Sequence, residues 1–380
     1  MKPLVVLPTL AVLFMPLAWQ PTQDRTLEGS WEAELRHWED AEWVLLSLRA
    51  RFDGERIHHG SSFRAGDLEG LDLLRGREGS VQFELRREAG AISFVGTQDG
   101  DEAWGDFTWT GSDSYLQAMA RLGYSGITTR DQFSMTLQDV TTTFVTAMQD
   151  RGYRDLSTRD LIRMRIHGVS PEFVDALAAE GYSDLSAQEL VRFRIHGVTP
   201  EFVAEMRAAG FEDMSTGDLR RARIHGVDPE YAQQMAAAGF ENLTFDDLVR
   251  FRIHGVSTDF VNEMAAMGYT HLSGDDVVRM RIHGVSPAFV REMEALGYDD
   301  LSAGTLRRMR IHGVSTSFVQ EMADVGYENV AVETLIRMRI HGVDADFVKE
   351  LEEHNFHDLS ADDLIEAKIH SSWWRRERTR

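Results

Sequence analysis

Histidine recurs along the chain in a register that could support metal chemistry, because imidazole nitrogen is a common zinc ligand. The histidines stand 29 residues apart, at His167, His196, His225, His254, His283, His312, His341 and His370. Zinc ligands lie about 2 Å from one shared ion, whereas packed neighbouring helices are roughly 8–10 Å apart. No second His, Asp or Cys recurs beside each histidine at ligand spacing. We therefore interpret the histidines as structural groups at helix ends, where the ring suits the negative end of the helix dipole, and we predict no metal or cofactor.

Catalytic and nucleic-acid-binding signatures are missing or weak. The chain has no His-Glu-x-x-His, no Gly-x-x-x-x-Gly-Lys and no Gly-x-Ser-x-Gly, so we predict that it is not an enzyme. The stretch IHGVSPEFVDAL (166–177) resembles the turn of helix-hairpin-helix modules, but Ser170 stands where such a turn needs a second glycine. Asp228 and Asp344 would face phosphate in later copies. A formal charge of −22 also opposes phosphate binding, and we predict no nucleic-acid partner.

The first twenty residues have the composition of an export signal. MKPLVVLPTLAVLFMPLAWQ places one lysine before an apolar run, which is typical of a secretory signal peptide (1–20) cleaved near Ala18 or Gln20. A membrane anchor is the alternative, but the run is short for a bilayer and prolines interrupt it. The chain contains no cysteine, so packing alone must stabilise it. We expect a secreted or periplasmic protein with no stable membrane span after cleavage.

Residues 26–111 have the alternation of apolar and polar residues that is typical of strands, in GSWEAEL, EWVLLSLRARF, SVQFELRRE, AISFVGTQ and EAWGDFTWT. Turn-forming stretches such as FDGE and QDGDEAWGD separate them. We predict a small antiparallel β domain of six or seven strands. Its aromatic residues are expected in the core, with a small-ligand pocket as the alternative: Trp31, Trp43, Phe83, Phe94, Trp104, Phe107 and Trp109.

From residue 112 to residue 370 the chain repeats with a period of 29 residues. In LSAQELVRFRIHGV, Ser186 and Glu189 have the spacing of a capping box, and Gly197 offers the left-handed position that ends a helix at His196. Thr199 caps a second helix. Helices this short are marginal alone, so the units must stack. The predicted fold class is α+β in two parts: a small antiparallel β domain (26–111), then an α-solenoid of nine 29-residue helix-pair repeats (112–370) and a basic C-terminal tail (371–380).

One arginine of each first helix falls inside the apolar arc of a helical wheel, between residues such as Leu161, Met164 and Ile166, so we predict that it is partly buried. A buried guanidinium needs partners, and the acidic position of the second helix offers one. The orphan carbonyl groups at the helix ends offer another. We therefore predict a structural ladder that fixes the register of the units, with an anion-binding groove as the alternative: Arg165, Arg194, Arg223, Arg252, Arg281, Arg310, Arg339, Glu205, Glu263, Glu292, Glu321 and Glu350.

The opposite side of the same wheel carries a second row of arginine and histidine. It is the candidate contact stripe for a partner, and a solvated surface is the alternative: Arg163, His167, Arg192, His196, Arg250, His254, Arg279, His283, Arg308, His312, Arg337 and His341.

The repeat is similar to one found in a known group of proteins. The unit RMRIHGVSPAFVREMEALGYDDLSA (279–303) and the segment GDFTWTGSDSYLQAMARLGY (105–124) resemble tandem repeats of bacterial envelope proteins, in particular those appended to membrane metallopeptidases of the β-lactam-sensing antirepressor type. The resemblance covers residues 27–370 and implies an exported bacterial accessory or sensor-associated module. The peptidase portion and its zinc motif are absent, so no proteolytic activity is implied.

The expected function is therefore that of an exported repeat scaffold for protein–protein interaction in the bacterial envelope. Self-assembly is one alternative, because open solenoid ends can stack on one another and Trp373, Trp374 and the arginines of the tail could meet a neighbouring copy. Binding of a small ligand in the β domain is the other.

Overall fold

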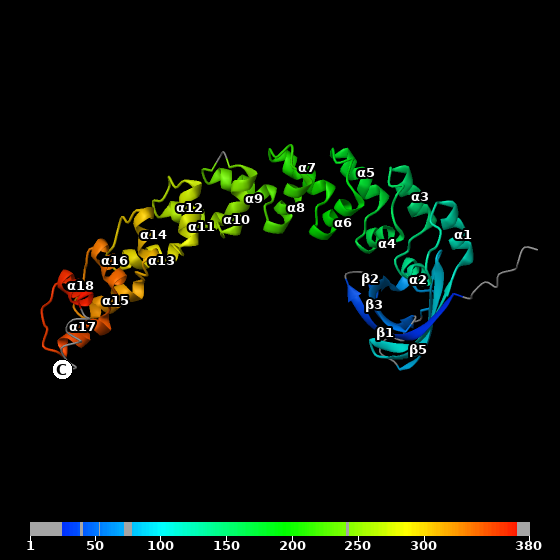
Figure 1. The fold of residues 1–380 in the computed structure, drawn as a ribbon, viewed down its shortest axis with the longest axis horizontal. Coiled ribbons are helices and arrows are strands. Elements are labelled where there is room, and N and C mark those ends of the chain that lie inside the picture. Colours follow the sequence, from blue (N-terminus) through cyan, green and yellow to red (C-terminus); the bar gives the residue numbers. More distant parts are fainter. Residues whose placement is uncertain (1–24, 39–40, 53, 72–77, 241–242, 371–380) are drawn as a thin grey trace, which may run out of the picture. The chain divides into compact units, whose positions relative to one another are not determined.

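The computed structural model describes residues 25–38, 41–52, 54–71, 78–240 and 243–370. In these residues a six-stranded antiparallel sheet precedes 18 α-helices, so the chain is α+β in two parts, as predicted (Figure 1). The described chain forms two compact units, divided between Val191 and Arg192 within helix α6 (Ala187–His196). The predicted signal peptide (1–20) and basic tail (371–380) lie outside the described residues.

The sheet is antiparallel throughout, in the order β3-β2-β1-β6-β5-β4. Its alternation sends Trp31, Phe94 and Trp109 to one buried face, which confirms that most of the aromatic residues form a core. Trp31 opposes Leu48 of one neighbouring strand and Gly105 of the other. The strands are β1 (Thr26–Trp38), β2 (Ala41–Phe52), β3 (Glu55–Arg64), β4 (Gly79–Arg87), β5 (Gly90–Asp99) and β6 (Glu102–Gly111), with a 3-10 turn η1 (Ala65–Asp67) after β3.

Helix α2 (Thr129–Leu137) completes the core of the sheet and contacts β4, β5 and β6 (Figure 1). The ring of Phe133 lies edge-on to Trp109, with 5.5 Å between the centroids. The indole Nε1 of Trp109 donates a hydrogen bond to Thr136 Oγ1 at 3.0 Å. The buried amide of Gln132 donates to the carbonyls of Ala89 and Ser112, at 2.9 and 3.0 Å. The buried side of the sheet is therefore closed by a helix that lies beyond the predicted strand region.

The helices begin and end at the residues that the sequence indicated. Ser186 and Glu189 form the predicted capping box, and Thr199 accepts a hydrogen bond from the Phe202 amide. Gly197 has a φ of +68°, in the left-handed region, where glycine has no steric penalty.

In the N-terminal unit α2 is accompanied by α1 (Asp113–Arg121), α3 (Thr142–Asp150), α4 (Thr158–Ile166) and α5 (Pro171–Ala179). After α6 follow α7 (Pro200–Ala208), α8 (Thr216–His225), α9 (Pro229–Ala237), α10 (Phe245–Ile253), α11 (Thr258–Ala266), α12 (Gly274–Ile282), α13 (Pro287–Ala295), α14 (Ala303–Ile311), α15 (Thr316–Asp324), α16 (Val332–His341), α17 (Ala345–Glu352) and α18 (Ala361–Ile369).

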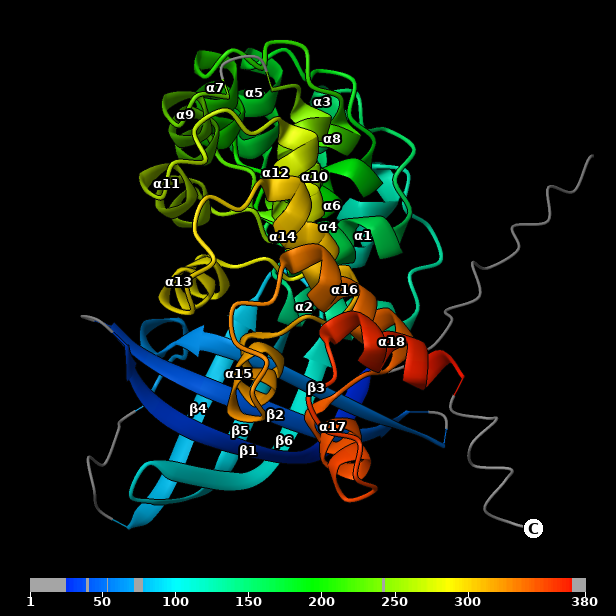
Figure 2. The same cartoon turned by 90° about the vertical axis from the view of Figure 1, so that its left-hand side faces the viewer.

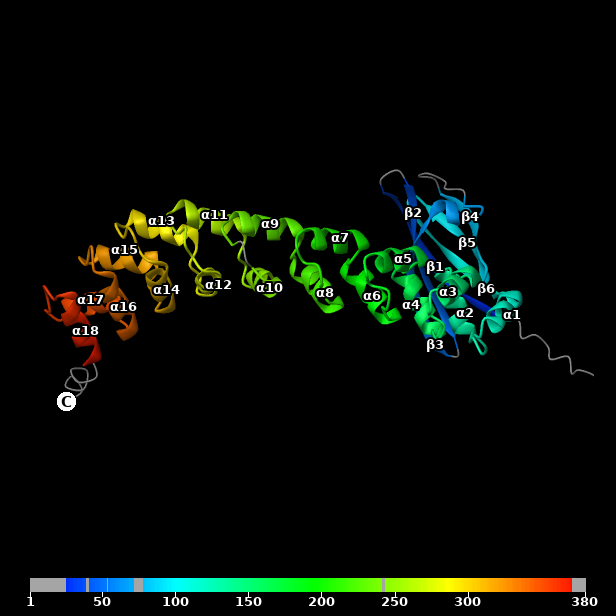
Figure 3. The same cartoon turned by 90° about the horizontal axis from the view of Figure 1, so that it is seen from above.

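The helices of the C-terminal unit lie in two rows. Each of α8, α10, α12, α14 and α16 contacts the next even-numbered helix, ending at α18, and α9, α11, α13 and α15 contact one another in the same way (Figures 2 and 3). The buried residues of one helix pair recur in the next, as Val249 and Val278 do in the first helices and Met264 and Met293 in the second. Within the described ranges, no helix combines the length and the apolar character needed to cross a bilayer.

Candidate functional site

The predicted arginine row lies at the contact between successive helix pairs. The Arg281 guanidinium lies over the Phe260 ring of the preceding pair, with Cζ 5.0 Å from the centroid, and Arg252 lies 3.6 Å from the Tyr231 centroid. Of the predicted row, Arg165, Arg252, Arg281 and Arg339 are half-buried, whereas Arg194, Arg223 and Arg310 are exposed. Equivalent stacking brings Arg165 over Phe144, Arg223 over Phe202, Arg310 over Phe289, Arg339 over Phe318 and Lys368 over Phe347.

The same guanidinium group also covers the glycine turn of the preceding pair. A methyl group added at Gly284 would lie 3.2 Å from Arg310 Nη2, and one at Gly255 would lie 3.2 Å from Arg281 Nη2. Arginine, glycine and the aromatic ring therefore form one repeated joint, in which a cation packs against a π face and a turn that has no side chain.

The acidic partners differ from the predicted ones. Glu263 pairs with Arg291 at 3.0 Å, and Glu292 accepts a hydrogen bond from Thr316 at 2.9 Å. Arg165 pairs with Asp139 at 3.3 Å and donates to the Gln138 carbonyl at 3.1 Å. Glu263 and Glu292 therefore meet other partners than the predicted arginine row, whereas the pairing of Glu205, Glu321 and Glu350 stays a prediction. The bond from Arg165 to the Gln138 carbonyl agrees with the expectation that carbonyl groups at helix ends can meet these arginines.

A substitution at Arg252 tests whether the repeated joint of arginine, glycine and aromatic ring stabilises the chain. Tyr231, under the guanidinium group, is buried and donates its hydroxyl hydrogen to the Val256 carbonyl at 2.7 Å; burial raises the pKa of Tyr231 to about 12. We expect Arg252→Met to lower the free energy of unfolding by about 1 kcal/mol, because methionine keeps the apolar contact and loses the cation–π term.

The measurement is urea unfolding of the full chain. Arg250→Met on the same helix is the control and should change stability by at most about 0.5 kcal/mol, since Arg250 makes an exposed ion pair. An Arg252→Met chain as stable as the unmodified one would argue against the joint.

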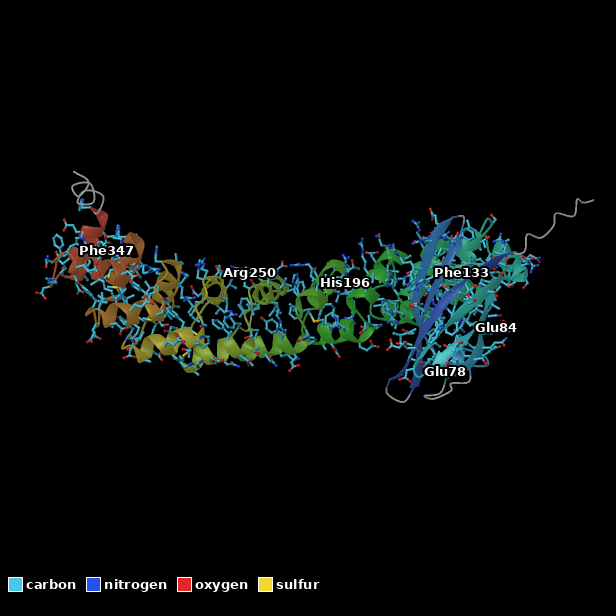
Figure 4. The ribbon with its side chains drawn as sticks, turned by 90° about the horizontal axis from the view of Figure 1, so that it is seen from below. Glu78, Glu84, Phe133, His196, Arg250 and Phe347 are labelled. Atoms are coloured by element: carbon cyan, nitrogen blue, oxygen red, sulfur yellow. The ribbon has the colours of Figure 1, made fainter. Side chains whose placement is uncertain are left out.

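The predicted contact stripe lies on the surface, and its arginines also link neighbouring pairs. All six of its arginines are exposed, whereas His167, His196, His254 and His283 are half-buried and His312 and His341 are exposed. Figure 4 labels Arg250 and His196, both of them on even-numbered helices. Several arginines reach the first turn of the next even-numbered helix: Arg250 with Asp275 at 2.6 Å, Arg308 with Glu333 at 2.6 Å and Arg337 with Asp362 at 2.8 Å. Such exposed pairs contribute about 0–1 kcal/mol each, so these arginines have a modest structural use.

The histidines of the repeat stand where their helices end. His254 and His283 follow the last residues of α10 and α12, and the glycine after each has a φ near +70°. In the described part of the chain, no group of three or more His, Cys, Asp or Glu side chains has the geometry to hold a metal ion. The repeated histidines do not converge on one point.

A row of exposed isoleucines is the feature that the sequence interpretation missed. The wheel placed Ile166 inside the apolar arc, but its side chain is 53% exposed, and the equivalent isoleucines are exposed to between 48% and 56%. The prediction that this position faces the core is therefore wrong. The row consists of Ile166, Ile195, Ile224, Ile253, Ile282, Ile311, Ile340 and Ile369.

A signal for this exposure was present in the spacing. Ile166 is five residues after the buried Leu161, which places it about 140° from Leu161 around the helix at 3.6 residues per turn. It is also three residues after Arg163, on the same side of the helix. An apolar residue at that angle reaches solvent unless another element covers it.

The exposed face of the sheet carries a concave region. Trp104 is 45% exposed and stands between Glu32 and Glu102 at the wall of a cavity of about 470 Å³. Glu32 accepts two hydrogen bonds from Arg49, at 2.7 and 3.0 Å. Trp104 is therefore an exception to the predicted aromatic core.

His59 links the sheet to α2 and makes the stability of this region depend on pH. Its Nε2 lies 3.2 Å from Gln138 Nε2, and burial, followed by the neighbouring His58, lowers the pKa of His59. An unfolded chain takes up a proton at this residue below about pH 6.5, whereas the folded chain resists protonation until the pH is lower. The free energy of unfolding should therefore fall as the pH drops below about 6.5.

Urea unfolding at several pH values should detect this linkage. The stability difference between the unmodified chain and His59→Gln should be constant above about pH 7 and shift in favour of His59→Gln at lower pH. Identical pH dependences of the two proteins would contradict it.

Comparison with known proteins does not indicate a function for the chain, so a functional proposal must be based on the structure. The chain matches no protein-family model, and no curated protein matches it significantly.

Proposed function

We propose that the chain is an exported, non-enzymatic repeat scaffold that binds a protein partner in the bacterial envelope. In this proposal nine helix pairs form an α-solenoid, and the resemblance to repeats of sensor-type envelope proteins suggests a sensor-associated role. The observation that carries the proposal is the exposed isoleucine row, because an apolar side chain recurs at one surface position while the opposite face of each helix is buried. Burying the exposed half of one isoleucine contributes about 1 kcal/mol, so several together support a stable complex.

The spacing of the row restricts the form of the partner. Adjacent helices in a layer are separated by roughly 8–10 Å. A polyproline II segment has three residues per turn and rises about 3.1 Å per residue, so it places every third side chain on one face about 9.3 Å apart. A β-strand places every second side chain on one face only about 6.6 Å apart. The partner is therefore an extended segment with an apolar residue at every third position.

Two peptides of about 12 residues test this proposal. The period-three peptide repeats Leu-Pro-Pro, and its control has the same composition with irregularly spaced leucines. We expect the full chain to bind the period-three peptide at least tenfold more tightly than the control in calorimetric titration. Equal affinities, or binding of neither peptide, would refute this form of partner.

A triple substitution tests the surface itself. Ile253→Ser, Ile282→Ser and Ile311→Ser together should weaken binding of the period-three peptide about tenfold or more and leave the thermal unfolding temperature nearly unchanged, since these side chains are exposed. The matched control replaces the buried Val249 with Ser, which should lower stability. Unchanged peptide affinity in the triple variant would exclude the isoleucine row. Association of the chain with itself would instead appear as a concentration-dependent mass in light scattering that the triple variant loses.

A further inference from the structure

The repeat that contains α8 and α9 has smaller core side chains than its neighbours. Ala232 stands where the other copies, at 29-residue spacing, have a buried valine: Val145, Val174, Val203, Val261, Val290, Val319 and Val348. Ala222 similarly replaces a large buried residue, which is Phe193 in the copy before it and Phe251 in the copy after it. Because protein interiors are close-packed, two such truncations in one repeat remove volume that the neighbouring repeats fill.

A cavity of about 280 Å³ lies against Ala232. Phe211, Phe240 and Leu248 form its apolar walls, and the exposed Gln233 stands at its rim. Both rings are held by a second ring: Phe211 meets Phe245 edge-on at 6.3 Å between centroids, and Phe240 meets Phe251 edge-on at 5.6 Å. Ring contacts with Phe245 and Phe251 therefore help to fix the two aromatic walls of the cavity.

Phe211 and Phe240 occupy the position, just after the second helix of a pair, that is tyrosine in later repeats. There the tyrosine hydroxyl group makes a contact with the next repeat. The Tyr269 hydroxyl donates to the Leu301 carbonyl at 2.7 Å, and the Tyr298 hydroxyl donates to the Val330 carbonyl at 2.9 Å. Phe211 and Phe240 have no hydroxyl group, so their rings contribute apolar surface without this hydrogen bond. The repeat thus differs from its neighbours in its smaller core residues and its open volume, and the rings that follow α7 and α9 both lack the tyrosine hydroxyl group.

The chemistry of the lining indicates the class of ligand. An apolar cavity of about 150 Å³ is sufficient to hold benzene, so this cavity accommodates a larger ring system. It also borders Ala209 and Gly210, directly after the end of α7. The amides of Ala209, Gly210 and Phe211 close this helix end by donating to the carbonyl groups of Glu205, Arg207 and Met206. The C-terminal end of a helix carries partial negative charge, which favours a hydrogen-bond donor nearby. We propose that this cavity binds a small aromatic molecule with an N–H donor, of the size of indole.

Titration of the full chain with indole tests the proposal. The unmodified chain should bind indole with one site per chain and should bind 1-methylindole, which has no N–H donor, several-fold more weakly. Ala232→Val restores the residue of the other repeats and should reduce indole affinity at least tenfold while raising the thermal unfolding temperature in the absence of ligand. Ala237→Val, on the exposed face of α9, is the control and should bind indole like the unmodified chain.

Methyl NMR of the unmodified chain provides a second measurement that does not depend on how the variants fold. Indole should shift the Ala232 and Ala236 methyl signals and leave that of Ala237 in place. The proposal is overturned if indole does not bind, if Ala232→Val binds it with undiminished affinity, or if the shifted methyl groups lie elsewhere.

Discussion

Replacing Phe133 with alanine should lower the free energy of unfolding of the N-terminal unit by about 3–5 kcal/mol. Phe133 is 3% exposed, and its ring lies 5.5 Å from Trp109 and 6.2 Å from Phe107, centroid to centroid. The side chain belongs to α2 but fills the core of the sheet (Figure 4). Removing the ring leaves a cavity between α2 and the sheet, and it weakens the contact by which α2 covers the buried face of the sheet. Urea unfolding followed by tryptophan fluorescence measures the change, because Trp31 and Trp109 are buried in the same core.

The same substitution at an exposed phenylalanine is the control. Phe356 is 53% exposed, and Phe356→Ala should change stability by no more than about 0.5 kcal/mol. A loss below 1 kcal/mol for Phe133→Ala would mean that the sheet does not depend on α2. A fragment ending at residue 111 should then also fold, whereas we expect that fragment to remain unfolded because Phe133 and Leu137 are missing from its core.

Gly313→Ala should destabilise the chain by about 1–2 kcal/mol, because the backbone at this residue is left-handed, with a φ of +73°. The glycine follows α14, and the Val314 amide donates to the Met309 carbonyl at 2.8 Å, which closes the helix end. An added methyl group would also lie 3.4 Å from Arg339 Nη2. The substitution therefore strains the turn and presses on the repeated joint between pairs.

Gly304, in the first turn of the same helix, gives a matched control of opposite sign. It has ordinary helical geometry and only the Ser302 hydroxyl within reach, 3.7 Å from an added methyl group. Gly304→Ala should stabilise the chain by about 0.4–1 kcal/mol, since alanine restricts the unfolded state. Thermal unfolding of the two variants should therefore move in opposite directions. Equal shifts would show that the left-handed turn after α14 is not under conformational constraint.

The helix ends could be predicted from the sequence because capping is local. Ser186 with Glu189, Thr199 before Pro200, and Gly197 each act within a few residues, so their spacing alone specifies where a helix starts or stops. The strands with strong alternation were also predictable. β3 was harder to recognise, because its inward positions include His59 and Ser61, which weaken the apolar pattern.

Contacts between helices and strands could not be predicted from local residue spacing. A helical wheel ranks the faces of one helix but does not reveal what lies opposite each face. It identified Arg252 as half-buried and could not supply Tyr231 as its neighbour. It also grouped Ile166 with the core, although no neighbouring element covers more than about half of that side chain. The docking of α2 on the sheet depends on the three-dimensional path of the chain between residues 111 and 129.

The central claim is that the repeated arginine and glycine residues are structural joints and that the repeats present an isoleucine binding surface. Isoleucine methyl NMR of the full chain, with and without the period-three peptide, tests this claim most directly. The account predicts that the methyl signals of Ile253, Ile282 and Ile311 shift on peptide addition, while those of the buried Ile92 and Ile365 stay in place. Signals of the exposed row that do not respond to bound peptide, or shifts confined to isoleucines elsewhere, would contradict it.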